Sequence, residues 1–417
     1  MNTVYENVRA LCVRTRNAIP QIATATHEMR TAALARMADA LVASTDEILA
    51  ANEIDLASAE ANGVPRVMLD RLALTRARVV GIAEGIRALI SLPDPLARAE
   101  MWERPSGIKI TRRAVPFGVV AMIFEARPNV TADAAALAIK SGNAVVLRGG
   151  KEAIATNRAI VAALGRALAA GGISPDVIGL VDDTTRESAT ALLSMRGLVD
   201  VLIPRGGKGL IRSCVENAKV PVIETGAGNC HVYVDAAADL GKALRVTVNA
   251  KCQRPSVCNA AESLLCHRAV AAEFLPAFYE ATRSYGLELR GCSATCALLP
   301  AVLPATDEDY YTEYNDYVMS VKIVDSVDEA IAHINETGTG HSEAIVTEDG
   351  AAAARFFDLV DAAAVYQNAS TRFTDGGEFG FGAEIGISTQ KMHARGPMGP
   401  EALTTVKYIV TGDGAVR

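Results

Sequence analysis

Several features that would place this protein in a class at once are absent from its sequence. The longest apolar runs, such as Val119–Phe124, are far too short to cross a bilayer. No long basic run occurs, and 41 Lys and Arg against 48 Asp and Glu give a net charge of −7. Residues 1–16 carry acidic and basic side chains among the apolar ones, unlike a signal peptide. We therefore expect a cytoplasmic protein that binds neither membranes nor nucleic acid.

Cysteine is too sparse for a disulfide scaffold. The 417 residues include only eight cysteines, which favours a reducing compartment. Cys252 with Cys258, and Cys292 with Cys296, lack a second cysteine or histidine pair at zinc-like spacing. We therefore expect no metal site. With 50% hydrophobic and 21% charged residues, the chain is ordinary globular material, long enough for two or more domains.

Helices and strands alternate through most of the chain. Residues 3–92 carry apolar residues at helical spacing, whereas residues 108–115 alternate like an exposed strand. Short apolar runs then alternate with helical stretches, which is typical of a doubly wound parallel sheet. The second half repeats this alternation more loosely and ends in a strand over residues 404–410. The strands expected in the first part are residues 119–124, 144–148, 177–181, 199–203 and 220–223.

Such sheets bind ligands at the carboxyl ends of their strands, and two of these ends carry glycine and positive charge. Gly206 and Gly207 form a turn before a helix that starts near Lys208, and backbone N–H groups at a helix N-terminus favour an anion. Arg148 and Lys151 follow a neighbouring strand and suit the 2′-phosphate of NADP rather than NAD. The alternative interpretation is a pair of ordinary solvated turns.

Cys258 lies in a stretch that has the features of a nucleophile site. Pro255 lacks a backbone donor and pushes Arg254 out of the helical region, so the chain presents Cys258 on a turn. Lys251 and Arg254 are cations close by in sequence, and a cation lowers the pKa of a thiol towards the reactive thiolate. The alternative is that Cys258 is a small buried hydrophobic residue.

Two more strand ends carry candidate polar groups. Asn129 follows Pro128 ahead of a helix, and its amide could donate to an oxyanion, as could the N–H of Cys258. The alternative for Asn129 is a helix N-cap. Glu224 ends an apolar strand before glycines and could act as a general base. The alternative for Glu224 is a solvated carboxylate.

Taken in order, these motifs resemble the aldehyde dehydrogenase superfamily, and within it the family of γ-glutamyl phosphate reductases. The resemblance covers essentially the whole chain. It implies an α/β fold of the aldehyde dehydrogenase type, with a doubly wound cofactor domain, an α/β catalytic domain and a small β oligomerisation arm. The segments that carry the resemblance are residues 115–120, 124–131, 140–150, 253–260 and 393–399.

The resemblance also implies an activity and three domains. The activity is NADPH-dependent reduction of L-glutamate 5-phosphate to L-glutamate 5-semialdehyde and phosphate, the second step of proline biosynthesis from glutamate. The expected domains are an NADP-binding domain over residues 1–103 and 116–227, a catalytic domain over residues 228–390, and an oligomerisation arm over residues 104–115 and 391–417. The acyl phosphate substrate would be delivered by glutamate 5-kinase, and the subunits would form a homo-oligomer.

Site residues are implied position by position. Cys258 matches the nucleophile, Asn129 the oxyanion asparagine and Glu224 the general base. The cofactor residues implied are Arg148, Lys151, Gly206, Gly207, Lys208 and Glu313. The candidates for holding the substrate are Arg127, Arg254 and Arg395.

The motifs around Arg148 and Cys258 depart from the superfamily pattern. Arg148–Glu152 stands where Lys-Pro-Ser-Glu is usual, and Gln253–Cys258 stands where Gly-Gln-x-Cys is usual. A hydrolytic aldehyde dehydrogenase acting on another small semialdehyde is one alternative function. A non-catalytic binding or structural protein is the other. A hydrolytic enzyme needs a base that activates water, whereas an acyl phosphate reductase must keep water from its thioester, so the role of Glu224 differs between them.

Overall fold

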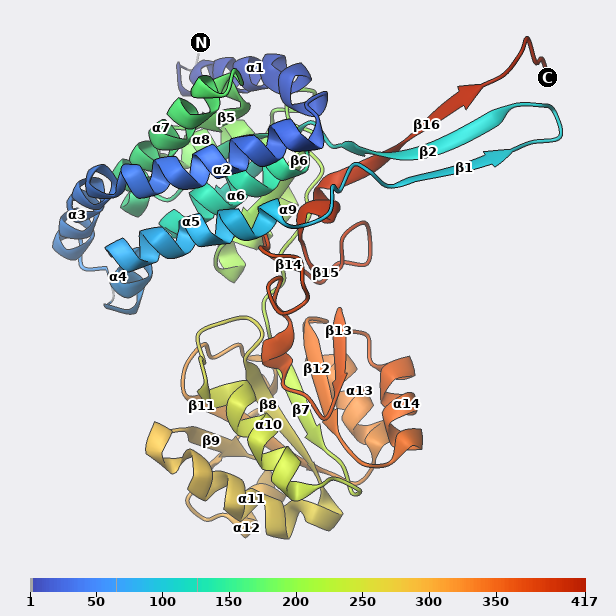
Figure 1. Ribbon diagram of the computed structural model, residues 1–417. Coiled ribbons are helices and arrows are strands. Elements are labelled where there is room, and N and C mark those ends of the chain that lie inside the picture. The colour runs from blue at the N-terminus through green and yellow to red at the C-terminus, as the bar shows by residue number, and fades with distance from the viewer. Residues whose placement is uncertain (1–2, 65, 126) are drawn as a thin grey trace. The chain divides into compact units, whose positions relative to one another are not determined.

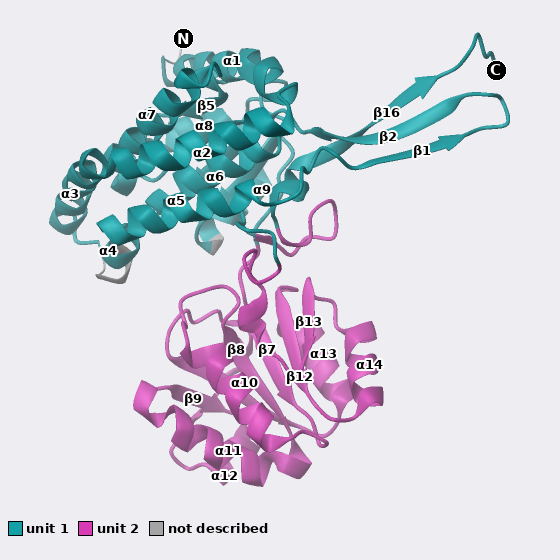
Figure 2. Cartoon of the chain, in the orientation of Figure 1, with its two compact units in different colours: residues 1–225, 380–386, 398–417 teal, residues 226–379, 387–397 magenta. Residues whose placement is uncertain are grey.

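The computed structural model describes residues 3–64, 66–125 and 127–417, which form two compact units (Figure 2). The first unit comprises residues 1–225, 380–386 and 398–417. The second unit comprises residues 226–379 and 387–397. The chain therefore passes from the first unit to the second directly after Thr225, the residue that follows Glu224.

Five helices open the first unit, as the sequence predicts (Figure 1). Threonine caps define two of their starts, because Thr26 and Thr75 accept hydrogen bonds from the N–H groups of Met29 and Arg78, each at 3.2 Å. Such caps satisfy donors that the first turn leaves unpaired. These helices are α1 (Thr3–Ala23), α2 (His27–Ala43), α3 (Thr45–Ala61), α4 (Arg66–Leu72) and α5 (Arg76–Ile90).

A four-stranded parallel sheet forms the centre of the first unit, in the order β5-β4-β3-β6. Every residue of β3 is buried, as expected for a strand covered on both faces. The strands are β3 (Val119–Phe124), β4 (Ala144–Arg148), β5 (Ile178–Leu180) and β6 (Val201–Arg205). The helices that alternate with them are α6 (Pro128–Lys140), α7 (Ile154–Ala170), α8 (Arg186–Leu193) and α9 (Lys208–Asn217).

The strand expected over residues 220–223 is wrong. Val222 forms only an isolated bridge with Leu202, fixed by a hydrogen bond from Ile223 N–H to the Leu202 carbonyl at 3.0 Å. Pro221 has no N–H to donate, so the segment cannot continue a ladder.

One helical stretch among the described residues, Lys151–Ala170, is long and apolar enough to cross a membrane by length and composition. It packs against α2, α3 and β5 in the first unit, as a core helix does.

An antiparallel ribbon extends from the first unit (Figure 1). Its strands are β1 (Ala99–Glu103), β2 (Lys109–Pro116) and β16 (Thr404–Thr411), in the order β1-β2-β16. The exposed strand predicted over residues 108–115 is therefore confirmed as β2. Trp102 meets Tyr408 edge to face across the ribbon, with ring centroids 6.3 Å apart. Met101 and Tyr408 are 69% and 57% exposed, so the ribbon presents apolar surface to solvent.

A second parallel sheet forms the centre of the second unit, in the order β10-β9-β11-β8-β7-β12-β13. Sequence patterns had not predicted β7 or β9. The strands are β7 (Cys230–Val234), β8 (Ala261–His267), β9 (Glu288–Gly291), β10 (Leu303–Pro304), β11 (Val318–Val324), β12 (Ser342–Val346) and β13 (Ala364–Gln367). The helices are α10 (Leu240–Cys252), α11 (Arg268–Thr282), α12 (Ser293–Leu298), α13 (Val327–Thr337) and α14 (Gly350–Leu359). A small hairpin pairs β14 (Ile387–Ser388) with β15 (Gly396–Pro397).

Because β7, β8 and β12 are parallel neighbours, their amino ends share one edge of this sheet. Cys230 begins β7, Cys258 lies just before β8, and His341 lies just before β12. The edge therefore brings together residues that are far apart in the sequence.

Candidate active site

The loop that carries Cys258 joins helix α10 to strand β8. The helix ends at Cys252, and the chain turns through Pro255 before β8 begins at Ala261, as the sequence predicts. Cys258 is half-buried in this loop. Its carbonyl oxygen accepts a hydrogen bond from the thiol of Cys230 at 3.2 Å. Strand β7 thus holds the backbone of the candidate nucleophile.

Gly228 approaches this loop more closely than any side chain would permit. A Cβ atom at Gly228 would lie 1.5 Å from the carbonyl oxygen of Cys258. The N–H of Gly228 donates to Glu313 Oε1 at 2.9 Å. Glu313, predicted as a cofactor contact, therefore holds the glycine segment against the nucleophile loop.

Lys251, a cation close to Cys258 in sequence, has a carboxylate partner of its own. It is fully buried and forms an ion pair with Glu262, which is also fully buried. Glu262 accepts a second hydrogen bond from the N–H of Asn315 at 3.1 Å. Burial raises the pKa of Glu262 to about 7, while the charge of Lys251 lowers it. The ammonium of Lys251 is thus neutralised by its own partner.

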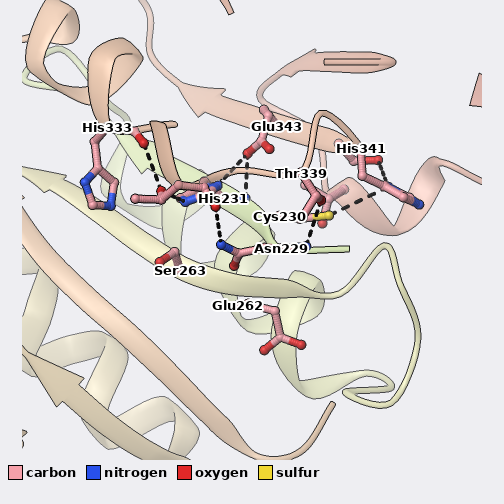
Figure 3. Close-up of polar contacts among 12 residues, drawn as sticks. Asn229, Cys230, His231, Glu262, Ser263, His333, Thr339, His341 and Glu343 are labelled. Atoms are coloured by element: carbon pink, nitrogen blue, oxygen red, sulfur yellow. Dashed lines mark hydrogen bonds and ion pairs between the residues drawn. The ribbon is translucent and has the colours of Figure 1, made fainter. Parts of the chain in front are cut away.

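A buried polar network lies beside Cys230 in the second unit (Figure 3). Glu343 accepts hydrogen bonds from the backbone N–H of His231 at 2.7 Å, and it lies 2.9 Å from His231 Nδ1. His231 Nε2 lies 3.1 Å from the hydroxyl of Thr337. Burial raises the pKa of Glu343, and the nearby His231 lowers it. The second carboxylate oxygen of Glu343, Oε1, is buried without a hydrogen-bond partner among the described residues.

Arg372 is a functional candidate that sequence reasoning missed. It lies in the 3₁₀ turn Thr371–Phe373, and its guanidinium donates to Gln253 Oε1 at 3.0 Å and to Asn259 Oδ1. Those two residues flank Cys258 in sequence. Desolvation and the charge of Arg254 lower the pKa of Arg372. No local pattern marks Arg372, because it comes to the loop from a distant part of the chain.

The other arginines predicted to hold substrate differ in their surroundings. Arg254 is exposed on the nucleophile loop. Arg395 forms an ion pair with Asp361 at 2.7 Å, and Lys391 pairs with the same carboxylate at 2.6 Å. Arg127 precedes α6 in the first unit as its N-cap residue, without a side-chain capping bond.

Asn129 is not the N-cap of α6, because Arg127 takes that position and Pro128 begins the helix. The amide of Asn129 donates instead to Asp133 Oδ2 at 3.0 Å, one turn further along the helix. Burial raises the pKa of Asp133 to about 6, although the Asn129 amide and the charge of Arg205 lower it. Asp133 therefore orients the side-chain amide of Asn129, which is the group predicted to donate to the oxyanion.

Arg148 ends strand β4 and Lys151 follows it, and the two side chains have different contacts. Arg148 Nη2 donates to the carbonyls of Thr184 and Thr185 at 2.7 and 2.8 Å, which ties the strand end to the loop before α8. Lys151 is exposed at the start of a 3₁₀ turn, Lys151–Ala153, that leads into α7. A phosphate at this edge would therefore meet Lys151.

The Gly206–Gly207 turn leads into α9 at Lys208, whose side chain lies outside the described part of the chain. Glu125, which follows β3, accepts a hydrogen bond from the N–H of Gly207 at 2.9 Å. A Cβ atom at Gly206 would lie 2.6 Å from the same carboxylate. A carboxylate thus stands where the sequence analysis expected a cofactor phosphate. Lys151 is thus open to an anionic cofactor group, whereas the N–H of Gly207 is occupied by Glu125 in this structure.

Glu224 is half-buried and lies in the irregular segment that follows the bridge at Val222. Its neighbour Thr225 donates its hydroxyl to the carbonyl of Pro204 at 2.8 Å. The candidate base is therefore held next to the end of β6.

Comparisons with known proteins agree on one family. A model described as the aldehyde dehydrogenase family matches residues 2–291 and 300–407. A γ-glutamyl phosphate reductase of Streptococcus suis is 60% identical over 394 residues, which cover 94% of this chain and 95% of the relative. One from Heliobacterium modesticaldum is 54% identical, covering 99% of this chain and 100% of the relative. A crystal structure of γ-glutamyl phosphate reductase from Thermotoga maritima has a TM-score of 0.96 at 46% identity, covering 98% and 99% of the two chains.

The fold and the family match together define the class: the chain belongs to the aldehyde dehydrogenase family of oxidoreductases. Membership of this family supports the use of a nicotinamide cofactor. Within it, the chain belongs to the γ-glutamyl phosphate reductases, because relatives with that name match nearly its full length at more than half identity. The resemblance found in the sequence motifs is thus confirmed.

Proposed function

We propose that the protein reduces L-glutamate 5-phosphate to L-glutamate 5-semialdehyde and phosphate, using NADPH, as the second step of proline biosynthesis from glutamate. The similarity to γ-glutamyl phosphate reductases over nearly the whole chain carries this proposal. The held, half-buried Cys258 supports it, since a covalent cysteine intermediate divides a hard reduction into two easier steps.

Glu224 takes the proton of the Cys258 thiol, and the resulting thiolate attacks the carbonyl carbon of the acyl phosphate. Asn129 and the N–H of Cys258 donate to the oxyanion. Phosphate leaves with the electron pair of the C–O bond, and a thioester remains on Cys258. When bound, NADPH would supply the hydride that reduces this thioester. The hemithioacetal anion on Cys258 then loses its C–S bond, which releases the aldehyde and restores the Cys258 thiolate.

Exposed Lys151 supports NADP rather than NAD as the cofactor, because a lysine ammonium at a strand end suits a 2′-phosphate. Arg148 contributes by fixing the strand end through Thr184 and Thr185. Glu313 would contact the ribose that carries the nicotinamide. The Gly206–Lys208 turn is available to the cofactor only when Glu125 releases Gly207.

The predicted domains remain our proposal for how the work is divided. Residues 1–103 and 116–227 bind NADP, residues 228–390 carry the catalytic cysteine, and residues 104–115 and 391–417 form an oligomerisation arm. The exposed Met101 and Tyr408 on the ribbon support a homo-oligomer that buries this surface. The enzyme acts in the cytoplasm on a small acyl phosphate that glutamate 5-kinase delivers.

The reverse reaction tests the proposal. Purified protein is given L-glutamate 5-semialdehyde and NADP, with and without inorganic phosphate, and NADPH formation is followed by absorbance. We expect turnover that requires phosphate and saturates with it, because phosphate must attack the Cys258 thioester. Phosphate-independent turnover that yields glutamate would establish the hydrolytic alternative instead.

A further inference from the structure

The turn that carries Arg372 is joined to the nucleophile loop by bonds in both directions. The side-chain amide of Asn259 donates to the carbonyls of Arg372 and Thr374, at 3.3 and 2.9 Å. In return, the hydroxyl of Thr371 donates to the carbonyl of Asn259 at 2.7 Å. The position of Arg372 relative to Cys258 is therefore set within the second unit.

Two guanidinium groups lie at this place with little negative charge between them. Arg372 is half-buried and Arg254 is exposed on the nucleophile loop, and the charge of Arg254 lowers the pKa of Arg372. In the part of the chain that the structure describes, neither guanidinium forms an ion pair with a carboxylate; the recorded bonds of Arg372 go to the neutral side-chain oxygens of Gln253 and Asn259. Asp375, whose charge also reaches Arg372, accepts the N–H of Gly377 at 2.8 Å.

Neighbouring arginines that form no ion pair with a carboxylate favour a doubly charged anion, and guanidinium groups match phosphate oxygens in geometry. In an acyl phosphate, a single bridging oxygen joins the phosphate to the carbon that the thiolate attacks. The phosphate must therefore lie next to Cys258, whereas the α-carboxylate lies at the far end of the substrate. Arg372, which is bonded to the loop that carries Cys258, is therefore placed for the phosphate and not for the α-carboxylate.

We propose that Arg372, assisted by Arg254, binds the phosphate of the acyl phosphate substrate and stabilises it as it leaves. This inference rests on the proposed function and adds to it the residues that recognise the leaving group. Neutral Gln253 and Asn259 hold the guanidinium of Arg372 in place without cancelling its charge, so the charge is available to the phosphate.

The phosphate-dependent reverse reaction separates this site from the rest of the substrate. We expect Arg372→Gln to raise the KM for inorganic phosphate on the order of 10- to 100-fold, the effect of losing charge-assisted hydrogen bonds. The KM for the semialdehyde should stay near its wild-type value. Arg372→Lys should recover part of the phosphate affinity, and Arg254→Gln should raise the phosphate KM by less. Arg355→Gln, which removes an exposed arginine of α14 that is paired with Asp328 of α13, serves as the matched control.

The outcomes distinguish this inference from the function on which it rests. Wild-type turnover without phosphate would overturn both. Phosphate-dependent wild-type turnover with an unchanged phosphate KM in Arg372→Gln would overturn the inference alone. A fall in kcat with both KM values moving together, and no recovery in Arg372→Lys, would show that Arg372 only supports the loop. Iodoacetamide labelling of Cys258 in each variant checks that the loop remains folded.

Discussion

The two units use opposite edges of their parallel sheets. In the first unit, the candidate residues lie at the carboxyl ends of the strands: Asn129 after β3, Arg148 at the end of β4, and Gly206 after β6. In the second unit, Cys258 lies at the amino ends of β7 and β8. It comes just before β8 in the sequence, and its carbonyl accepts a hydrogen bond from Cys230, the first residue of β7. The first edge leaves Lys151 open to solvent, which suits a cofactor that must come and go. The second edge is closely packed, which suits a nucleophile held in one geometry.

Removal of the thiol at the packed edge should have the largest effect. Cys258→Ala is expected to lower kcat on the order of 10⁴-fold or more, because no thioester can form. NADPH binding, measured by fluorescence titration, should be retained, because the proposed cofactor residues belong mainly to the first unit. Cys296→Ser, at a partly exposed cysteine of the same unit, is the control. Near-normal turnover of Cys258→Ala would disprove the assignment.

The buried ion pair beneath the same edge should decide the stability of the second unit. Lys251→Met is expected to cost ~3–5 kcal/mol in free energy of unfolding, because it leaves the buried carboxyl of Glu262 without its ion-pair and hydrogen-bond partner. Lys251→Met combined with Glu262→Gln should cost less. Lys242→Met, which breaks the exposed pair with Glu348, should cost at most ~1 kcal/mol. Urea denaturation followed by circular dichroism measures all three, and equal losses for Lys251→Met and Lys242→Met would contradict the expectation.

A substitution at Gly228, which packs against the Cys258 carbonyl, should lower the activity less than loss of the thiol does. Gly228→Ala places a Cβ atom against the Cys258 carbonyl, so the nucleophile loop must move. A displacement of about 1 Å is expected to lower kcat on the order of 10²-fold. Gly350→Ala, where a Cβ atom would meet nothing within 4 Å, should leave kcat unchanged. Steady-state kinetics would show the idea to be wrong if the two variants behaved alike.

At the open edge, the expected effect is the smallest and concerns only the cofactor. Lys151→Ala should raise the KM for NADPH about tenfold, the loss of one charge-assisted contact to a phosphate. The KM for NADH and the kcat should change little. Arg158→Ala, on the following helix and paired with Asp182, is the control for a general change of charge. An equal rise in the KM for NADPH and for NADH would show that Lys151 does not bind the 2′-phosphate.

Local patterns were sufficient for most elements and for the position of the nucleophile. Strands β3 and β4 were expected from their apolar runs, and Pro255 indicated where the chain turns before Cys258. Strands β7 and β9 were not predicted, since His231 interrupts the apolar run of β7 and charged Glu288 and Arg290 interrupt that of β9. The expected strand at 220–223 failed because Pro221 interrupts its hydrogen bonding.

The amino-acid sequence by itself determined the family, through long motifs around Asn129, Arg148 and Cys258, and it determined the turn that presents the thiol. Only the tertiary structure decided which charges act there. Lys251 is close to Cys258 in sequence but is neutralised by Glu262, whereas Arg372 is far away in sequence and bonded to the nucleophile loop. The reason is physical: charges act through space, and the folding of the chain, rather than sequence separation, sets the distances and burial on which their effect depends.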